Sequence, residues 1–598
     1  MIDIEDSHIE LQDERKKKSG LKLDLNRKMS EYTEEIYHDS IIPEKIKVLV
    51  KTWGCSHNTS DSEYMAGILA KFGYQVDLDG SKSVEEIKSS LPKVDFYSRY
   101  NVVIFNSCTV KGPSEDHFRN EITEAKKYKL KIIVAGCVPQ SRPTADYFKD
   151  ISIVGVQQID RILEIIEGTL NGYIIRLLEE KLSEDKSKKI GGARLDLPKI
   201  RKNELIEIIA ISTGCLNACT YCKTKHARGE LGSYPLEDIV ARAKTAFSEG
   251  VKEIWLTSED LGAYGHDLTR EFDMESESYA NWYLHNGCST TSLSAKYPRH
   301  YTLADLLARL VNVIPEGCML RMGMTNPPYI LDLIDEICFI LSLPRVYSFI
   351  HIPVQSCSNE VLRVMQREYT RENFCLLVEK LLNHFGDYKR VSIATDIICG
   401  FPNENDNDFD DTYDICERFR FPSLYVNQFF ARPGTPAANM KRVCSTDQVK
   451  RRTAKLHNLF RSYQLMDHLM GKRLRILVTE TSSHDQLVGH TKCYQQILVE
   501  KDFNLMGKIV EVEITKCDKF FCVGRVIDKE KFFTSLTEDG DEEYLVNHEF
   551  KSIERPSAIS KCIFAIQRLP LIEISIVVVI SCWALSKLKI NKMSELIK

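Results

Sequence analysis

Short apolar runs alternate with amphipathic stretches in the first part of the chain, residues 45–175. The runs are KVLV at 47–50, NVVIF at 101–105 and KIIVAG at 131–136. Apolar runs separated by helical patterns are typical of a parallel sheet covered by helices. We therefore predict an α/β domain over 45–175, followed by a polar linker at 180–192.

The same alternation continues over residues 200–445 and is longer there. Six βα units are too few to close an eight-stranded barrel, so we predict an open, partial (βα)6 barrel. Residues 268–300 contain no convincing element and are predicted to form an inserted loop. The six candidate strands lie at 205–212, 253–258, 318–323, 346–352, 391–398 and 424–430.

The two ends of the chain differ from the middle. Short strand patterns separated by turns over 465–530 predict a small β-barrel. Further on, Leu569–Ser586 has Glu573 as its single charge and basic residues on both sides. Its length meets the lower limit for a membrane-spanning helix, so we predict a transmembrane tail anchor at 569–588; a buried or peripheral helix is the alternative. Residues 1–44 are polar and are predicted to be a disordered tail.

Composition limits the classes of function. The 598 residues suggest several domains, and a net charge of −5 excludes a uniformly basic nucleic-acid-binding protein. Any nucleic-acid site must then be a local basic patch, for which 194–202, 223–228 and 472–475 are the candidates. The N-terminus lacks the apolar core of a secretory signal. Reduced thiols are therefore expected, and metal or cluster ligation explains some of the 19 cysteines better than disulfides do.

Three of these cysteines, Cys215, Cys219 and Cys222, lie within eight residues directly after a predicted strand. Three thiolates at this spacing can hold three corners of an iron–sulfur cube and leave its fourth iron open. A zinc site with His226 as fourth ligand is the alternative. The C-x3-C-x2-C pattern resembles the radical SAM superfamily. That resemblance implies that the open iron binds S-adenosylmethionine and that an electron cleaves it to a 5′-deoxyadenosyl radical.

Three further cysteines, Cys55, Cys108 and Cys137, each follow one of the apolar runs of the first domain. The carboxyl ends of parallel strands share one edge of a sheet, so these side chains are expected to converge. We predict a second three-cysteine cluster there. Reactive redox cysteines are the alternative.

Two three-cysteine sites followed by a small β-barrel resemble the tRNA methylthiotransferases. That family has an N-terminal methylthiotransferase domain, a radical SAM domain and a TRAM domain. The segments at 106–120, 192–203, 213–235 and 324–330 are similar to its eukaryotic branch specific for threonylcarbamoyladenosine. The C-terminal apolar segment is similar to a tail-anchored form of that branch. This implies an endoplasmic reticulum membrane location with the catalytic domains facing the cytosol.

The resemblance also implies two [4Fe–4S] clusters as cofactors beside S-adenosylmethionine. The cluster ligands would be the six cysteines already named. Four polar residues at predicted strand ends are implied contacts to cofactor or substrate, with structural hydrogen bonding as the alternative: Glu259, Gln355, Asp396 and Arg432. The chain departs from the family pattern at Asn403, where a glycine is usual, and at Asn405, where a threonine is usual.

The implied reaction converts N6-threonylcarbamoyladenosine next to the anticodon of tRNA to its 2-methylthio form. It requires electron and sulfur donors that the sequence does not identify. Methylthiotransferases for isopentenyladenosine or for a protein are alternatives within the same chemistry. A membrane-tethered RNA-binding or regulatory scaffold with vestigial clusters, or a zinc-stabilised binding module, are alternatives from other classes.

Overall fold

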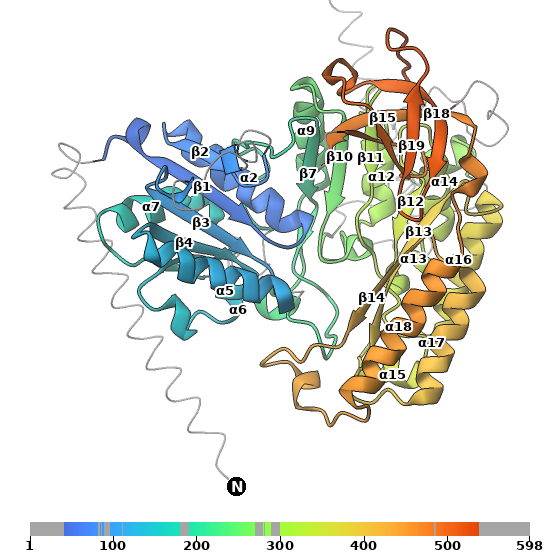
Figure 1. Cartoon of the computed structure of the whole chain (residues 1–598), viewed down its shortest axis with the longest axis horizontal. Coiled ribbons are helices and arrows are strands. Elements are labelled where there is room, and N and C mark those ends of the chain that lie inside the picture. Colours follow the sequence, from blue (N-terminus) through green and yellow to red (C-terminus); the bar gives the residue numbers. More distant parts are fainter. Residues whose placement is uncertain are drawn as a thin grey trace, which may run out of the picture.

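The computed structural model of the chain describes residues 41–81, 84, 87–88, 96–109, 112–179, 191–269, 279, 281–288, 300–482 and 486–537. An N-terminal α/β domain lies beside a larger α/β domain, and a small β-barrel packs on the latter (Figure 1). The predicted N-terminal tail up to residue 40 and the predicted tail anchor at 569–588 lie outside the described residues. Within these ranges, no helix is both long enough and apolar enough to span a membrane.

The N-terminal domain contains a six-stranded sheet with the order β2-β1-β3-β4-β5-β6, and all its pairings are parallel. Its strands alternate between two cores, with Val102 and Ile104 in one and Val103 and Phe105 in the other. Burial on both faces explains why these strands are continuous apolar runs. The strands are β1 (Lys47–Thr52), β2 (Gln75–Leu78), β3 (Val102–Ser107), β4 (Lys131–Gly136), β5 (Ser152–Val154) and β6 (Arg176–Leu177). The main helices are α2 (Ser56–Lys71), α5 (Gly112–Lys127), α6 (Cys137–Ser141) and α7 (Ile162–Leu170).

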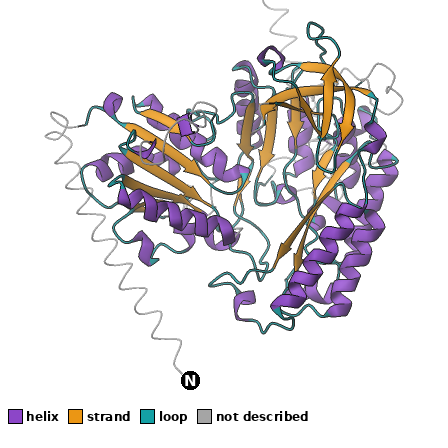
Figure 2. Ribbon diagram, viewed as in Figure 1, coloured by secondary structure: helices purple, strands orange, loops and turns teal. Residues whose placement is uncertain are grey.

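The larger domain has six parallel strands in two three-stranded sheets, β11-β10-β7 and β12-β13-β14. The two sheets meet at isolated parallel bridges, one between Leu320 and Val346 and one between Met324 and His351. The result is an open, curved wall with helices outside it (Figure 2). The strands are β7 (Ile206–Ala210), β10 (Glu253–Thr257), β11 (Met319–Arg321), β12 (Phe349–His351), β13 (Ser392–Cys399) and β14 (Ser423–Gln428). The main helices are α9 (Leu236–Ser248), α12 (Leu303–Val311), α14 (Ile334–Ser342), α16 (Arg371–Phe385), α17 (Asp406–Phe419) and α18 (Thr446–Ser462).

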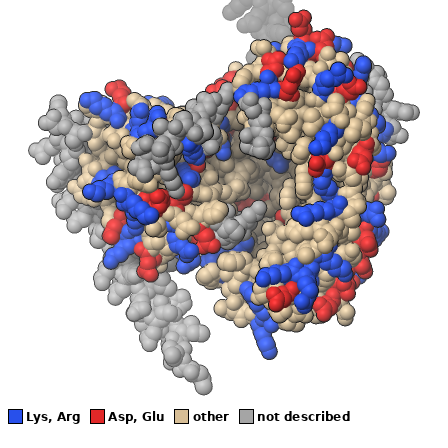
Figure 3. All heavy atoms as spheres, in the orientation of Figure 1, with Lys and Arg blue, Asp and Glu red and all other residues tan. Residues whose placement is uncertain are grey.

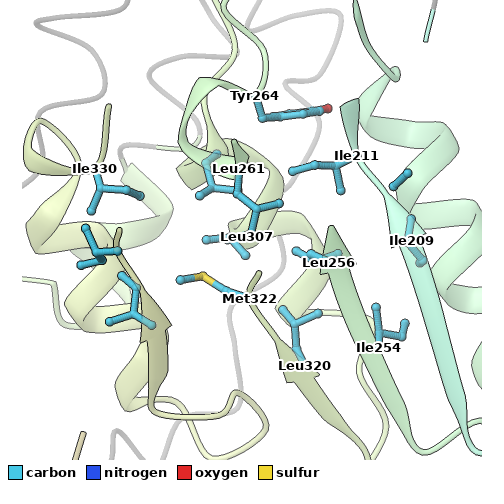
Figure 4. Packing of buried hydrophobic residues seen from close by; sticks show 14 of the residues in the cluster. Ile209, Ile211, Ile254, Leu256, Leu261, Tyr264, Leu307, Leu320, Met322 and Ile330 are labelled. Atoms are coloured by element: carbon cyan, nitrogen blue, oxygen red, sulfur yellow. The ribbon is translucent and has the colours of Figure 1, made fainter. Parts of the chain in front are cut away.

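Alternate residues of the wall point to opposite sides. Leu256 of β10 and Leu320 of β11 pack with Leu307 of α12 on the helical side (Figure 4). Because successive side chains of a strand face opposite ways, Trp255 and Arg321 face the inner side of the wall.

The small barrel is closed, with the strand order β15-β16-β17-β19-β18. It packs against the strand starts of the larger domain, where Leu477 and Ile509 meet Tyr347 and Phe349. Its strands are β15 (Arg473–Thr481), β16 (Leu487–His490), β17 (Gln496–Val499), β18 (Ile509–Cys517) and β19 (Cys522–Val526). The small β-barrel predicted over 465–530 is confirmed.

The prediction of a structureless insertion at 268–300 is wrong for its described part. Residues 281–285 are helical. Trp282 and Tyr283 are buried and pack edge-on against Phe339 of α14, and the Tyr283 hydroxyl donates to the carbonyl of Ala304 at 2.7 Å. A helix this short shows no clear helical period in the sequence, so the sequence pattern did not predict it.

The N-terminal domain is joined to the larger domain through α2, which is buried along most of its length. The Lys199 ammonium lies 3.1 Å from a carboxylate oxygen of Glu63 on α2 and 3.0 Å from one of Glu207 on β7. Its side chain is fully buried. Lys199 therefore joins two domains, and its prediction as part of a basic patch that contacts RNA is wrong.

Candidate active site

The three clustered cysteines lie on a tight loop between β8 (Ser212–Thr213) and the short helix α8 (Thr224–Arg228). Gly214 precedes the loop at φ +78°, and a Cβ there would lie 1.9 Å from the carbonyl oxygen of Glu230. Only glycine fits this close approach of two backbone segments. The amide of Cys215 donates to Gly229 at 3.2 Å, which closes the base of the loop.

The loop is fixed to the strand ends of the larger domain. The Thr220 amide donates to Met365 at 3.0 Å. The Arg432 guanidinium donates to the carbonyl of Tyr221 at 3.2 Å, which places this predicted contact residue beside the loop. Arg367, which the sequence analysis did not single out, donates to the Cys219 sulfur at 3.2 Å.

Burial raises the pKa of the Cys215 and Cys219 thiols, and the Arg367 charge partly offsets this rise at Cys219. A thiol must lose its proton before it ligates iron. A fixed cation in contact with the sulfur favours the thiolate, so Arg367 makes this donor set suitable for cluster binding.

Asp260 holds the loop from the other side. Its carboxylate accepts from the Asn326 amide nitrogen at 3.0 Å and from the Asn326 side chain at 2.7 Å. The Asn217 side chain, between two of the cysteines, donates to Asp260 at 3.5 Å.

The other three cysteines come together at the carboxyl ends of β1, β3 and β4. A Cβ at Gly54, next to Cys55, would lie 2.2 Å from the Cβ of Cys108. A hydrogen bond from Cys108, assisted by the nearby Arg228 charge, lowers the pKa of Cys55 to about 6. The Cys137 sulfur lies 3.8 Å from Oδ1 of the Asn58 side chain, and burial raises the pKa of the Cys137 thiol to about 12. The convergence inferred from the strand ends is present, while cluster ligation by these residues stays a prediction.

Arg228 connects the two cysteine sites. It ends α8, which follows the first cysteine loop, and its guanidinium donates to Asn58 at 2.8 Å and to Asp61 at 2.7 Å. Its Nε lies 3.1 Å from Oε1 of Glu259. Its hydrogen bond to Cys137 favours the thiolate there. Because Arg228 is 2% exposed, its prediction as an RNA contact is wrong.

Glu259 directs one of its two carboxylate oxygens to this network. Oε1 lies 3.1 Å from both His57 and Arg228. Oε2 is buried and accepts no hydrogen bond from the residues that the structure describes. A buried carboxylate oxygen without a donor fits the ammonium group of an amino acid, so Glu259 suits the cofactor-binding role that the resemblance implies.

The remaining predicted contacts, Gln355 and Asp396, lie farther down the inner wall. Gln355 adopts φ +67°, and its amide donates to the carbonyl of Asp396 at 2.8 Å. The Asp396 carboxylate pairs with His351. The structure therefore brings Gln355 and Asp396 together and places Arg432 at the loop instead.

Within the described ranges, no three His, Cys, Asp or Glu side chains surround one point closely enough to bind a single metal ion. A tetrahedral zinc site built from the clustered cysteines and His226 needs that arrangement. The ligands of a [4Fe–4S] cube bind separate iron atoms and do not need it.

The fold and the two cysteine sites define an α/β enzyme of the radical SAM type. The family descriptions that match are "Radical SAM superfamily" over 209–416, "Uncharacterized protein family UPF0004" over 47–154 and "TRAM domain" over 468–527. A radical S-adenosylmethionine methyltransferase from Kitasatospora setae, TsrM, has a TM-score of 0.42 and 14% identity over 66% of this chain and 75% of that chain. This last likeness is too weak to support an argument.

Curated relatives are much more similar. The threonylcarbamoyladenosine tRNA methylthiotransferase of Danio rerio is 49% identical over 84% of this chain and 82% of its own length. That of Homo sapiens is 49% identical over 83% of this chain and 76% of its own length. A probable enzyme of the same name from Pyrococcus abyssi is 31% identical over 81% of this chain and all of its own length. The chain belongs to the threonylcarbamoyladenosine tRNA methylthiotransferase family.

Proposed function

We propose that this protein converts N6-threonylcarbamoyladenosine next to the anticodon of tRNA to its 2-methylthio derivative. The observation that carries the proposal is the pair of three-cysteine sites that a single buried arginine, Arg228, joins. The relatives at 49% identity carry the name of this reaction.

Each set of residues has a role in this reaction. Cys215, Cys219 and Cys222 would hold the cluster that binds S-adenosylmethionine, and Glu259 would accept from the amino group of that cofactor. Cys55, Cys108 and Cys137 would hold a second [4Fe–4S] cluster, and Arg228 lies between this site and the first cysteine loop. When bound, the clusters and S-adenosylmethionine supply the methylthio group and the radical that removes hydrogen from C2 of adenine.

The residues of the chain position and protect these groups. Arg367 and Arg228 place fixed positive charges beside the Cys219 and Cys137 sulfurs, which favours the thiolates. Figure 3 shows that the surface is hollowed between the N-terminal domain and the larger domain, with Lys and Arg side chains on both sides. A hollow with basic sides suits an anticodon loop whose target base is turned out of its stack.

The direct test is nucleoside mass spectrometry of tRNA from cells that lack this protein. Specific loss of 2-methylthio-threonylcarbamoyladenosine, with accumulation of the unmethylthiolated precursor, is expected. Restoration by the wild-type chain but not by a Cys55→Ala variant would tie the second site to the reaction. An unchanged nucleoside profile would contradict the proposed substrate.

The second cluster has a separate test that does not need activity. Anaerobically reconstituted protein is expected to bind about eight iron atoms, and a variant with Cys55, Cys108 and Cys137 replaced by alanine about four. Equal iron content in the two proteins would refute the second cluster.

We also propose that the chain is anchored in the endoplasmic reticulum membrane by residues 569–588, with its catalytic domains in the cytosol. Support comes from the apolar segment Leu569–Ser586, which has one charge and basic residues on both sides. The test is fractionation of the full chain against a chain that ends at residue 568. The full chain should remain with membranes after carbonate extraction, and its extraction together with the shortened chain would refute the anchor.

A further inference from the structure

The inner side of the barrel wall, between the cysteine loop and the small β-barrel, carries a layer of polar and aromatic side chains that are not fully buried. The side chains of His351 and Asp396 are 24% and 23% exposed, and Tyr425 is 50% exposed. Trp255 and Arg321 are half-buried on the adjoining strands. Side chains inside a filled barrel are packed away from solvent, so this layer borders an open space in the barrel.

Arg321 is the cation of this layer. Its guanidinium carbon lies 4.8 Å from the ring centre of Trp255, 5.1 Å from that of Phe349 and 4.6 Å from that of Tyr494. Its Nε is buried and donates no hydrogen bond within the described part of the chain, where no carboxylate forms an ion pair with this guanidinium either. Aromatic faces hold the guanidinium plane and leave its N–H edge for another acceptor.

Two acidic residues lie near Arg321 but do not occupy its donors. The Glu253 carboxylate already accepts from Trp255 at 2.7 Å, from Tyr347 at 2.8 Å and from Thr479 at 2.8 Å. Burial raises the pKa of Glu480 to about 7, so this group is partly neutral at physiological pH. The nearby carboxyl groups of Glu253 and Glu480 partly balance the positive charge of Arg321. Its N–H groups can still donate hydrogen bonds to a ligand.

A continuous segment of the chain connects the layer to the first cysteine site. Five residues after Arg321, the Asn326 side chain accepts from Arg367, which in turn donates to Cys219. The same segment pairs with His351 through Met324. A base turned into the barrel to meet the cofactor would therefore direct its substituents at this layer.

We propose that Arg321 binds the carboxylate of the threonylcarbamoyl group of the substrate, and so is a residue that determines substrate specificity. This inference rests on the proposed function. A guanidinium binds a carboxylate through two parallel hydrogen bonds, and the Tyr425 hydroxyl and the His351–Asp396 pair are placed for the other polar atoms of the substituent. An adenine with an uncharged N6 substituent would cover the Arg321 guanidinium without supplying a charged acceptor and would be rejected for that reason.

The test compares two synthetic anticodon stem-loop RNAs with the reconstituted full-length holoenzyme. One carries N6-threonylcarbamoyladenosine, and the other carries the same group with its carboxylate replaced by a primary carboxamide. Fluorescence anisotropy measures both dissociation constants. The wild-type protein is expected to prefer the carboxylate RNA by about 10- to 100-fold, the usual range for a hydrogen bond between charged groups.

Arg321→Gln is expected to remove this preference by weakening binding of the carboxylate RNA alone, and Arg321→Lys, which keeps the charge, to retain part of it. Arg309→Gln is the matched control, because Arg309 lies on α12 outside the wall and pairs with Glu237. Circular dichroism and iron content of each variant check that it is folded and loaded.

Three results would overturn the inference: no preference in the wild-type protein, an unchanged preference in Arg321→Gln, or equal weakening of both RNAs. The wild-type comparison decides the matter even if Arg321→Gln does not fold. Methylthiolation of the carboxylate RNA is measured in the same preparation. Its absence would count against the proposed function, whereas methylthiolation without a preference would count against the role of Arg321 alone.

Discussion

Replacement of Arg228 by glutamine should loosen the joint between the two cysteine sites. Arg228 is 2% exposed and pairs with Asp61 of α2 and with Glu259, which follows β10. Glutamine removes the positive charge and leaves these two buried carboxylates facing each other. The change acts on three segments that are distant in sequence and belong to two domains.

The magnitude follows from burial. The side chains of Asp61 and Glu259 are 10% and 9% exposed, so solvent screens them little. Removal of one partner of a buried ion pair costs about 3–5 kcal/mol, because the other charge stays buried without compensation. His57 remains 3.1 Å from Glu259 and limits the loss of stability, so we expect Arg228→Gln to cost about 3 kcal/mol.

Hydrogen exchange of the cluster-free protein under reducing, anaerobic conditions measures this loss where it occurs. A multidomain chain has no single free energy of unfolding, so protection of α2 and α8 is the appropriate quantity. The variants are Arg228→Gln, Asp61→Asn and the two combined. The double variant should lose less protection against exchange than the two single variants together. Each single change leaves one buried charge without its partner, and the double change removes both charges.

Arg309→Gln provides the control for this experiment. Arg309 and Glu237 form a surface pair at 2.8 Å, with Glu237 59% exposed, and such pairs contribute about 0–1 kcal/mol. A loss below about 1 kcal/mol for Arg228→Gln, equal to that of the control, would refute the view that this buried charge joins the domains.

The other predictions concern single positions. Cys219→Ala should abolish methylthiolation and leave the circular dichroism spectrum unchanged; product in a nucleoside assay would contradict its assigned role. Gly214→Ala should destabilise the cysteine loop more than Gly250→Ala destabilises its own turn, for which about 1 kcal/mol is expected. Gly250 also has a positive φ, but a Cβ there would meet no other atom. Equal urea midpoints would show that the close approach at Gly214 is unimportant. Burial raises the pKa of Glu480 from 4.5 to about 7, so the contribution of Glu480 to stability should fall as pH rises from 4.5 to 7, by up to about 3 kcal/mol. Glu480→Gln should therefore be the more stable protein at pH 8 and equal to wild type at pH 4, which thermal unfolding at the two pH values measures.

The two groups of cysteines could be predicted from the sequence because each depends on a local sequence pattern. Cys215, Cys219 and Cys222 have a fixed spacing, and Cys55, Cys108 and Cys137 follow apolar runs whose parallel pairing determines where they end. The same three runs predicted β1, β3 and β4 of the N-terminal sheet, whereas β2, β5 and β6 were not predicted. Other apolar patterns predicted the six strands of the wall and the small barrel. These features depend on neighbouring residues or on general rules of sheet topology.

Long-range pairing of charges has no such local signal. In the sequence, Arg228 lies among Lys223, Lys225 and His226 and has the appearance of an exposed basic stretch. Its partner Asp61 is separated from it by 167 residues. Lys199 is comparable, since its partner Glu63 belongs to another domain. A basic residue can be assigned to RNA or to an internal ion pair only after the domains are placed against each other.

The neighbouring acidic residues Glu259 and Asp260 face different cysteine sites. Both residues follow β10, and neighbouring side chains of an extended segment face opposite ways. Asp260 turns to Asn326 and the first cysteine loop, while Glu259 turns to His57 and Arg228 at the second site. Position after the strand predicted that an acid would lie near the cofactor, but not which acid would face which site. Glu259 Oε2 is buried and has no donor among the described residues, while Oε1 faces Arg228, so one carboxylate can contact both the Arg228 network and a bound amino group.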